Sequence, residues 1–249
     1  MKGIVLAGGK GSRLFPITLA VSKQLLPIYD KPMIYYPLSV LMLLGIRDIL
    51  LITNKADLKG FRQLLKDGRH LGLDIQYAVQ KKPGGLAEAF LIGETFIAKQ
   101  NVCLILGDNF FYGPQLALEL GQGARIKEGA MIFGCKVKEP QDYGVVTFDS
   151  RRQIQKLEEK PLRPSSRYAV PGIYFYDNQV ALLAKTLKPS SRQELEITDL
   201  NNLYLQQKKL KLNLLRKSTV WIDAGTCAAF QRAAAFVQAV QQKKGMKIA

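Results

Sequence analysis

The sequence predicts an α/β fold: a single Rossmann-like domain with a central mixed, mostly parallel sheet flanked by helices. Two observations predict it. Short apolar runs alternate with helix-like segments through the first half of the chain, which is the pattern of parallel βαβ units. Some of these runs, such as Val102–Leu106, are apolar throughout, as expected of strands that helices cover on both faces.

The predicted elements of the first half follow one another closely. We expect strands at residues 3–7, 49–53, 75–79 and 102–106, with helices between them at 33–44, 58–65 and 86–96. From residue 130 the pattern becomes richer in strands, at 131–137, 145–148, 154–157 and 169–176, followed by helices near 177–186 and 199–207. A last helix at 226–243 repeats Ala, Phe and Val at helical spacing. We therefore expect one domain, 1–249, with 1–129 and 130–249 as its two halves.

The composition is that of a globular protein. A chain of 249 residues with 47% hydrophobic content can build one large core. The apolar stretch 34–44 is interrupted by Pro37 and Ser39 and falls short of the ~20 residues that a membrane span needs. Met1 leads directly into a predicted strand, without the pattern of a signal peptide. We expect a cytoplasmic protein with no membrane partner.

Cysteine and histidine usage argues against several chemistries. Cys103, Cys135 and Cys227 are widely spaced and odd in number, so they predict neither a disulfide framework nor a Cys-based metal site. A single histidine, His70, makes histidine-rich zinc sites and Ser-His-Asp triads poor explanations of any activity.

The net charge of +16 favours anionic partners, which are either phosphorylated small molecules or nucleic acid. The basic runs at 208–211, 216–217 and 243–244 resemble solvated faces more than a binding arm. No zinc-finger, zipper or RNA-binding sequence pattern is present. We therefore expect no nucleic-acid partner.

A glycine-rich loop follows the first predicted strand and is the strongest local signal in the chain. Its glycines permit positive φ and close backbone approach to an anion, and two cations follow at short spacing. The loop matches neither G-x-x-x-x-G-K-[ST] nor G-x-G-x-x-G well. An ordinary strand-to-helix turn with surface cations is the alternative. The candidate phosphate-binding residues are Gly8, Gly9, Gly11, Ser12, Arg13 and Lys23.

Two aspartates are candidate metal ligands. Asp108 comes just after the buried strand 102–106, at the same edge of the predicted sheet as the glycine loop, and can offer Mg²⁺ a hard oxygen ligand. Asp223 is the second candidate. The alternatives are a turn or helix N-cap for Asp108 and the N-cap of the last helix for Asp223.

Residues 6–18, LAGGKGSRLFPIT, and 22–27, SKQLLP, resemble the signature of sugar-phosphate nucleotidylyltransferases, L-A-G-G-x-G-[ST]-R-L-x-P-[LI]-T followed by P-K-x-L-[LV]-P. Ser22 stands where many relatives have proline, and the Ser-Lys-Gln form is similar to the glucose-1-phosphate thymidylyltransferase subfamily. Further matches follow in the family's order at 30–39, 106–109, 143–146, 158–161, 168–172 and 194–199. The chain is thereby identified as a member of this family.

The resemblance implies a nucleotidyltransferase that makes dTDP-glucose and pyrophosphate from dTTP and glucose 1-phosphate with Mg²⁺, for dTDP-rhamnose and cell-surface polysaccharide synthesis. The sugar phosphate would attack the α-phosphorus in line. Because this nucleophile is already an anion, the reaction needs positioning, cations and a metal more than acid–base groups. A chain almost free of histidine suits that chemistry.

The resemblance also assigns roles to residues. Residues 1–129 would bind the nucleotide and 130–249 the sugar phosphate. Arg13 would bind the β- and γ-phosphates, Lys23 the α-phosphate and Lys160 the sugar phosphate, with Asp108 and Asp223 as metal ligands. Without the resemblance, the segment around Lys160 reads as a solvated charge run. The implied sugar-side contacts are Tyr143, Gly144, Glu159 and Val170, with Arg192 as a further phosphate-side cation.

The resemblance places recognition of the base at Gln80, with the backbone of Gly85, and gives Gln24 a place on the nucleoside side. An amide can pair with the edge that thymine and uracil share. The methyl group that separates them is worth only ~1–3 kcal/mol. Use of UTP or of another sugar phosphate therefore remains an alternative.

The chain departs from the family pattern in two places. The usual D-T-G-T-H-D-S reads Asp-Ala-Gly-Thr-Cys-Ala-Ala at 223–229, so four polar side chains near the metal end are replaced. The sequence also ends at residue 249, where longer relatives continue into a segment that forms a regulatory nucleotide site and subunit contacts. We expect a homo-oligomer with altered regulation. A catalytically weak paralogue that binds nucleotide sugar is the alternative from another functional class.

Overall fold

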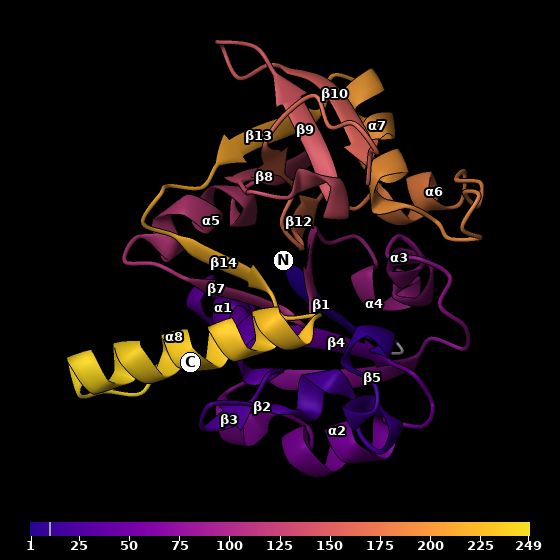
Figure 1. Ribbon diagram of the computed structural model, residues 1–249. Helices are drawn as coiled ribbons and strands as arrows, with labels where there is room; N and C mark the ends of the chain where they lie inside the picture. The colour runs from indigo at the N-terminus through magenta and orange to yellow at the C-terminus, as the bar shows by residue number, and fades with distance from the viewer. Residues whose placement is uncertain (10) are drawn as a thin grey trace.

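The computed structural model describes residues 1–9 and 11–249, so Lys10 of the glycine loop lies outside the described residues. One large sheet forms the centre of the molecule (Figure 1). Its strands are β1 (Lys2–Ala7), β4 (Asp48–Thr53), β5 (Asp74–Val79), β6 (Val102–Leu106), β8 (Ala130–Lys136), β9 (Gly144–Phe148), β10 (Ile154–Glu159), β11 (Tyr168–Ala169), β12 (Ile173–Tyr176) and β13 (Leu210–Leu214). Their order is β10-β9-β11-β8-β12-β6-β1-β4-β5, and β13 pairs with β8.

The first half of the chain builds the parallel part of this sheet. Strand β1 lies between β4 and β6, with Val5 opposite Leu51 on one side and Ile105 on the other, and β5 extends the parallel arrangement beyond β4. Because parallel strands end at the same edge, the segments that follow β1 and β6 meet there. This places the glycine loop next to Asp108.

The second half adds strands that are mostly antiparallel. Strand β12 pairs antiparallel with β6 and with β8, while β9 and β10 form a hairpin at the far edge of the sheet. Strand β13 runs parallel to β8. The sheet is thus mixed, and the predicted α/β fold class is confirmed.

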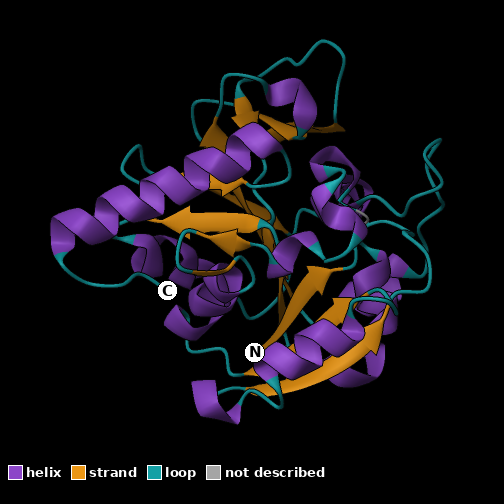
Figure 2. Cartoon of the chain, turned by 60° about the horizontal axis from the view of Figure 1, so that its bottom comes forward, coloured by secondary structure: helices purple, strands orange, loops and turns teal. Residues whose placement is uncertain are grey.

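Helices cover both faces of the sheet (Figure 2). Along β1, Ile4 packs into a core with α3, α6 and α7, and Val5 packs into a second core with α1, α2 and α5. Burial on both faces explains why the central strands are apolar at successive positions. Among the described residues, no helix has the length and apolarity that crossing a membrane requires. The helices are α1 (Tyr35–Leu43), α2 (Leu58–Leu65), α3 (Glu88–Ile92), α4 (Glu94–Ile97), α5 (Leu116–Ala124), α6 (Val180–Ala184), α7 (Ile197–Gln206) and α8 (Cys227–Lys244).

Two small strand pairs complete the fold. Strands β2 (Pro27–Ile28) and β3 (Lys31–Pro32) form a hairpin, and β7 (Asn109–Tyr112) pairs antiparallel with β14 (Val220–Asp223). Helix α8 follows β14, and the hydroxyl oxygen of Thr226 accepts a hydrogen bond from the Ala229 N–H at 3.2 Å. The N-cap of α8 is therefore Thr226, and the alternative role of Asp223 as that cap is wrong.

Three details of the predicted elements are also wrong. The helix expected at 86–96 is two helices, α3 and α4, separated at Gly93. The strand expected at 169–176 is β11 and β12, because Pro171 has no N–H for a strand ladder. The basic run 208–211 is not only a solvated face, since Leu210 starts β13 and its side chain packs on the core.

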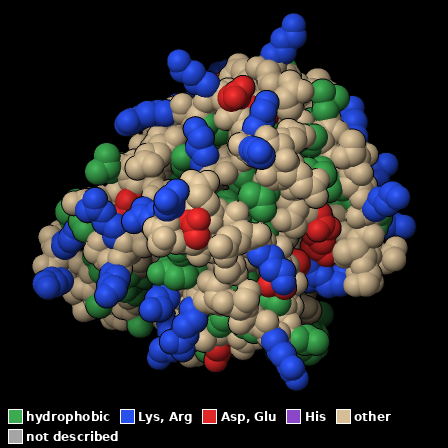
Figure 3. Space-filling model, turned by 90° about the horizontal axis from the view of Figure 1, so that it is seen from above, with side chains coloured by type: hydrophobic (Ala, Val, Ile, Leu, Met, Phe, Trp, Pro, Cys, Tyr) green, Lys and Arg blue, Asp and Glu red, His purple; other side chains and the backbone are tan. Residues whose placement is uncertain are grey.

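The positive charge does not gather in one place on the face shown in Figure 3, where Lys and Arg side chains are scattered among polar and apolar atoms. Scattered cations are typical of a solvated surface and unlike the grouped basic stripe of a nucleic-acid-binding module.

Candidate active site

Two adjoining cavities open where the segments after β1 and β6 meet. The first has a volume of about 220 Å³, and the second, nearer the end of β5, about 190 Å³. Both are lined by Leu86, Leu106, Asp108 and Glu194, so they share a wall. The predicted residues at the first cavity are Arg13, Asp108, Tyr143, Gly144, Glu159, Lys160, Val170, Arg192 and Asp223. Those at the second are Gly8, Gly9, Lys23, Gln24, Gln80, Gly85 and Asp108.

Two predicted residues lie apart from the rest. Of the described residues of the glycine loop, Gly11 and Ser12 line neither cavity. Gly11 has a φ of +64° and its carbonyl accepts hydrogen bonds from the Leu14 N–H at 2.8 Å and the Thr18 hydroxyl at 2.9 Å. These contacts fold the loop so that Arg13 points toward the first cavity.

Asp108 lies at the wall that the cavities share. Its carboxylate contacts the Lys23 ammonium, and the Asn109 side-chain amide donates to it at 3.1 Å. Burial alone would raise the pKa of Asp108, but the charge and hydrogen bond of Lys23, with the Asn109 bond, outweigh burial and hold that pKa below its usual value. Asp108 is therefore an ionised carboxylate in a buried setting.

Asp223 reaches the same place from the end of β14. The Ala224 N–H donates to the Asp108 carbonyl at 2.9 Å, which fixes the two segments side by side. Burial, together with the charge of Asp108, raises the pKa of Asp223 to about 6, against the opposing charges of Lys23 and Arg13. The two carboxylates thus repel each other, and a further cation beside them would reduce this repulsion.

Arg13 lies beside Asp223 with its guanidinium mostly exposed. Its Nη2 is 3.9 Å from Asp223 Oδ2. A Cβ at Gly225 would lie 2.8 Å from the same nitrogen, so glycine there lets the arginine approach. A guanidinium that is weakly paired and open to solvent is available to an anion.

The far side of the first cavity is built by β9 and β10. Glu159 at the end of β10 lies opposite Gly144, and the Thr198 hydroxyl donates to its carboxylate at 2.5 Å. The next residue, Lys160, has a φ of +43° and its N–H donates to the Tyr143 carbonyl at 3.0 Å. A carboxylate and an ammonium therefore project from adjacent positions at the cavity.

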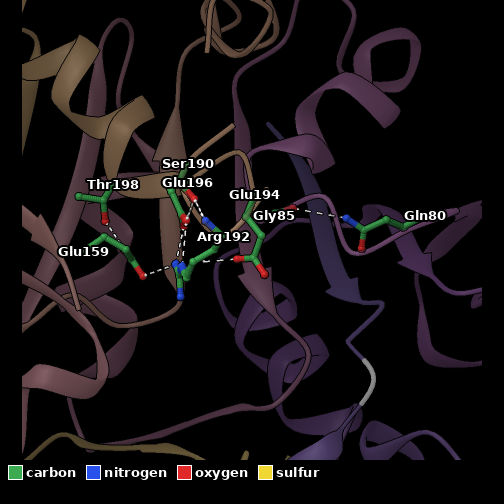
Figure 4. Close-up of polar contacts among 8 residues, drawn as sticks. All are labelled: Gln80, Gly85, Glu159, Ser190, Arg192, Glu194, Glu196 and Thr198. Carbon is green, nitrogen blue, oxygen red and sulfur yellow. Dashed lines mark hydrogen bonds and ion pairs between the residues drawn. The ribbon is translucent and has the colours of Figure 1, made fainter. Parts of the chain in front are cut away.

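Arg192 enters the first cavity from the turn before α7 (Figure 4). Its Nη2 lies 2.7 Å from Glu196, 3.3 Å from Glu159 and 3.8 Å from Glu194. The hydrogen bond to Glu196, opposed by partial burial and aided by the charges of all three carboxylates, raises the pKa of Arg192 above its usual value. The guanidinium is a permanent cation.

The second cavity ends at two buried amides. Gln80, after β5, donates from Nε2 to Glu88 at 2.6 Å and more weakly to the Gly85 carbonyl at 3.4 Å. Gly85 has a φ of +97° and packs against the backbone of Leu195, where a Cβ would lie 2.3 Å from the carbonyl oxygen. The Ser22 hydroxyl donates to Gln24 Oε1 at 2.7 Å, so the departure from proline at position 22 gives Gln24 a fixed orientation.

Sequence reasoning assigned no role to several residues that line the first cavity. Asn109 accepts from the Trp221 indole at 2.7 Å and from the Gly172 N–H at 3.0 Å, joining β7, β14 and β12 at the site. Glu196 and Thr198 line the cavity as well. Their only signal was the family match at 194–199, which does not tell which side chains face inward.

The departures at 223–229 have different surroundings. Ala224 and Ala229 are buried, Ala228 is exposed, and Cys227 is exposed with its sulfur 3.9 Å from the Arg13 carbonyl. Position 224 contacts Asp108 through its backbone N–H, a contact that does not depend on the side chain. Position 227 is the departure whose side chain contacts Arg13.

Comparisons with known proteins show the family of the chain. The nucleotidyl transferase family model matches residues 2–240. The chain is 55% identical over 249 residues to a glucose-1-phosphate thymidylyltransferase of Neisseria gonorrhoeae, covering 100% of this chain and 86% of the relative. It is 52% identical over 248 residues to the enzyme of that name from Mycobacterium tuberculosis strain ATCC 25618 / H37Rv, with coverage of 100% and 86%.

Solved structures are similar over almost the whole chain. A crystal structure of a Bacillus anthracis protein in complex with a sucrose gives a TM-score of 0.88 at 43% identity and covers 95% of this chain and 94% of that one. A UDP-glucose pyrophosphorylase complexed with UDP-glucose gives a TM-score of 0.83 at 25% identity, with coverage of 97% and 98%.

Proposed function

The chain belongs to the nucleotidyl transferase family, and from that premise we propose that it transfers the thymidylyl group of dTTP to glucose 1-phosphate, forming dTDP-glucose and pyrophosphate. The observation that carries the proposal is the pair of cavities that meet at Asp108. One ends at amides that suit a pyrimidine base, and the other at a carboxylate and cations that suit a sugar phosphate. Similarity to enzymes named for this reaction supports the choice of substrates.

The chemistry matches the side chains that line the cavities. A phosphate oxygen of glucose 1-phosphate forms a bond to the α-phosphorus of dTTP, while the bond from that phosphorus to the β-phosphate bridging oxygen breaks. Pyrophosphate carries the electron pair away, and no proton has to move. The difficulty is to bring two anions together. Arg13, Lys23, Lys160 and Arg192, which line the two cavities, would supply the positive charge for this purpose.

We propose that Asp108 and Asp223 hold Mg²⁺. The fit rests on the buried Asp108 and the partly buried Asp223, whose segments are joined by the hydrogen bond from the Ala224 N–H to the Asp108 carbonyl. Burial and then the charge of Asp108 raise the pKa of Asp223 to about 6, and a divalent cation would offset both. Mg²⁺ is commonly held by one or two carboxylates plus substrate phosphates and water. When bound, the ion would neutralise charge on the phosphates.

Each cation would serve a different phosphate. Arg13, which is open to solvent, would bind the β- and γ-phosphates and the departing pyrophosphate. Lys23 lies against Asp108 and would neutralise the α-phosphate as charge shifts between its oxygens. Lys160 and Arg192 would bind the phosphate of the sugar. Glu159, with Tyr143, Gly144 and Val170, would contact the sugar ring.

Lys160→Ala is expected to raise the KM for glucose 1-phosphate about tenfold or more, because a charge-assisted contact to the sugar phosphate is lost. The KM for dTTP should stay within about twofold, since Lys160 lines only the sugar-side cavity. Steady-state kinetics with each substrate varied in turn measure both values. Lys156→Ala is the matched control, because this lysine lies on β10, the strand that Lys160 follows, and pairs with Glu158 at the surface. Normal kinetics in Lys160→Ala would remove this lysine from the proposed site.

The function is tested by pyrophosphate release from glucose 1-phosphate and a panel of dTTP, UTP, ATP, CTP and GTP, with and without Mg²⁺. We expect Mg²⁺-dependent release with dTTP, weaker release with UTP, and almost none with the other three. The two pyrimidines share the edge that Gln80 would read, so their separation rests on a methyl contact worth ~1–3 kcal/mol. Absence of release with every nucleotide, in protein that binds dTDP-glucose, would contradict the proposal and favour a regulatory role.

A further inference from the structure

The turn that carries Arg192 is closed by its own hydrogen bonds. The Ser190 N–H donates to the Glu194 carbonyl at 2.9 Å, and the Gln193 N–H donates to the Ser190 carbonyl at 2.9 Å. Leu195 ties the turn to the loop beside the second cavity, because its N–H donates to Gly84 at 2.8 Å and its carbonyl accepts from Ala87 at 3.1 Å. The backbone of the turn is thus fixed against the nucleotide half of the site.

Glu196 holds the side chain of Arg192 at two points (Figure 4). Arg192 donates from Nε to Glu196 Oε1 at 3.1 Å and from Nη2 to Oε2 at 2.7 Å. The Ser190 hydroxyl donates to Oε1 as well, at 2.6 Å. The Glu196 side chain is only 8% exposed, whereas that of Arg192 is 38% exposed. The carboxylate is therefore a buried anchor, and the outer end of the guanidinium remains open to the cavity.

The other two carboxylates near Arg192 make weaker contacts. Glu159 and Glu194 each approach Nη2 alone, at 3.3 Å and 3.8 Å. Glu159 also accepts from Thr198, and both side chains are more exposed than that of Glu196. Two parallel hydrogen bonds fix the plane of a guanidinium, and a single contact does not. The orientation of Arg192 therefore depends chiefly on Glu196.

The side chain of Glu196 has no competing task in the part of the chain that the structure describes. Glu196 precedes α7 as its N-cap residue, yet its side chain makes no capping hydrogen bond there. The hydrogen bonds to its carboxylate come from Ser190 and Arg192. Its loss should therefore affect Arg192 more than the helix.

We propose that Glu196, braced by Ser190, is a positioning residue that holds the guanidinium of Arg192 with its open end toward the phosphate of the sugar 1-phosphate. This inference rests on the proposed function, in which Arg192 binds that phosphate. A guanidinium fixed before the substrate arrives loses less conformational freedom on binding. Glu196 itself touches no reacting atom.

The test is Glu196→Gln, which keeps the shape of the side chain but leaves one accepting oxygen in place of two and removes the charge. The KM for glucose 1-phosphate should rise about tenfold, the usual scale for a lost charge-assisted hydrogen bond, while the KM for dTTP stays within about twofold. Glu94→Gln is the matched control, because Glu94 pairs with Lys185 at the surface and should change neither KM. Ser190→Ala should raise the same KM by less and leave α7 intact.

A double-mutant cycle decides whether Glu196 acts through Arg192. If it does, Glu196→Gln should add little to the effect of Arg192→Lys. Multiplicative effects of the two changes, or a normal KM for glucose 1-phosphate in both Glu196→Gln and Ser190→Ala, would overturn the inference. If Glu196→Gln fails to fold, Ser190→Ala combined with Arg192→Lys supplies the cycle. Failure of the proposed function would show instead in the wild-type protein, as absent turnover with dTTP and glucose 1-phosphate.

Discussion

Asp108→Asn is expected to lower kcat by roughly 10²–10³, the scale for removing one group that stabilises developing charge in a transition state. Asn keeps the shape of the side chain but loses the charge that balances Lys23 and that would hold Mg²⁺. The loss should appear in kcat, measured with both substrates saturating, because Asp108 lies at the wall shared by the two cavities.

Pyrophosphate release at saturating substrates measures the kcat of each protein, and the assay is repeated over a range of Mg²⁺ concentrations. Asp48→Asn is the matched control, because this aspartate is exposed at the start of β4, at the opposite end of the strand from the site. A fall in kcat that excess Mg²⁺ restores fully would mean that Asp108 sets only metal affinity. An unchanged kcat would exclude Asp108 from the site.

Lys23→Met is expected to lower kcat on the same scale, roughly 10²–10³, because the α-phosphate would lose the cation that neutralises it. The change should also destabilise the protein in the absence of metal. The Lys23 ammonium contacts Asp108 and offsets the charge of Asp223, so its removal leaves the buried Asp108 and the partly buried Asp223 to repel each other without that cation. Because Mg²⁺ would replace the missing charge, the melting temperature of the variant should rise more with added Mg²⁺ than that of the wild type.

Thermal unfolding with and without Mg²⁺ measures the stability, and steady-state kinetics measure the turnover. Lys99→Met, at an exposed position before β6, is the control and should leave both quantities unchanged. A Lys23→Met protein with normal kcat would contradict the proposed role. An equal rise in melting temperature with Mg²⁺ in both proteins would show that the Lys23 ammonium and Mg²⁺ do not neutralise the same carboxylates.

The local pattern of apolar and polar residues predicted the elements that are buried either on both faces or along one clear side. Strand β6 and helix α2 have the predicted bounds, because one is buried on both faces and the other has a clear apolar side. Strand β14 could not be found this way. It is four residues long, and its partner β7 lies more than a hundred residues earlier, so its pairing depends on tertiary contacts. Helix α5 was missed as well, and its segment carries two glycines.

The candidate site likewise has a part that the sequence predicts and a part that it does not. The loop and aspartate at the ends of β1 and β6 follow from parallel topology, since those ends must meet. Contacts between distant segments do not follow. The pairing of Lys23 with Asp108 and of Arg192 with Glu159 joins residues from separate elements, and no spacing rule relates them. Glu196 stayed unassigned although it lies four residues after Arg192, because the segment between them is not helical and the i,i+4 pairing rule applies to helices.

The most direct test of the central claim is the stereochemistry at phosphorus. In the proposed reaction, glucose 1-phosphate attacks the α-phosphorus of dTTP in one in-line step. The protein would be given a single diastereomer of dTTP with sulfur on the α-phosphorus, with Mg²⁺ and glucose 1-phosphate, and the product followed by phosphorus NMR. A single in-line step gives the analogue of dTDP-glucose that keeps sulfur on its α-phosphorus, with inverted configuration there and one pyrophosphate per product. Retained configuration would show a covalent nucleotidyl–enzyme intermediate, and absence of the nucleotide sugar would contradict the proposed function itself.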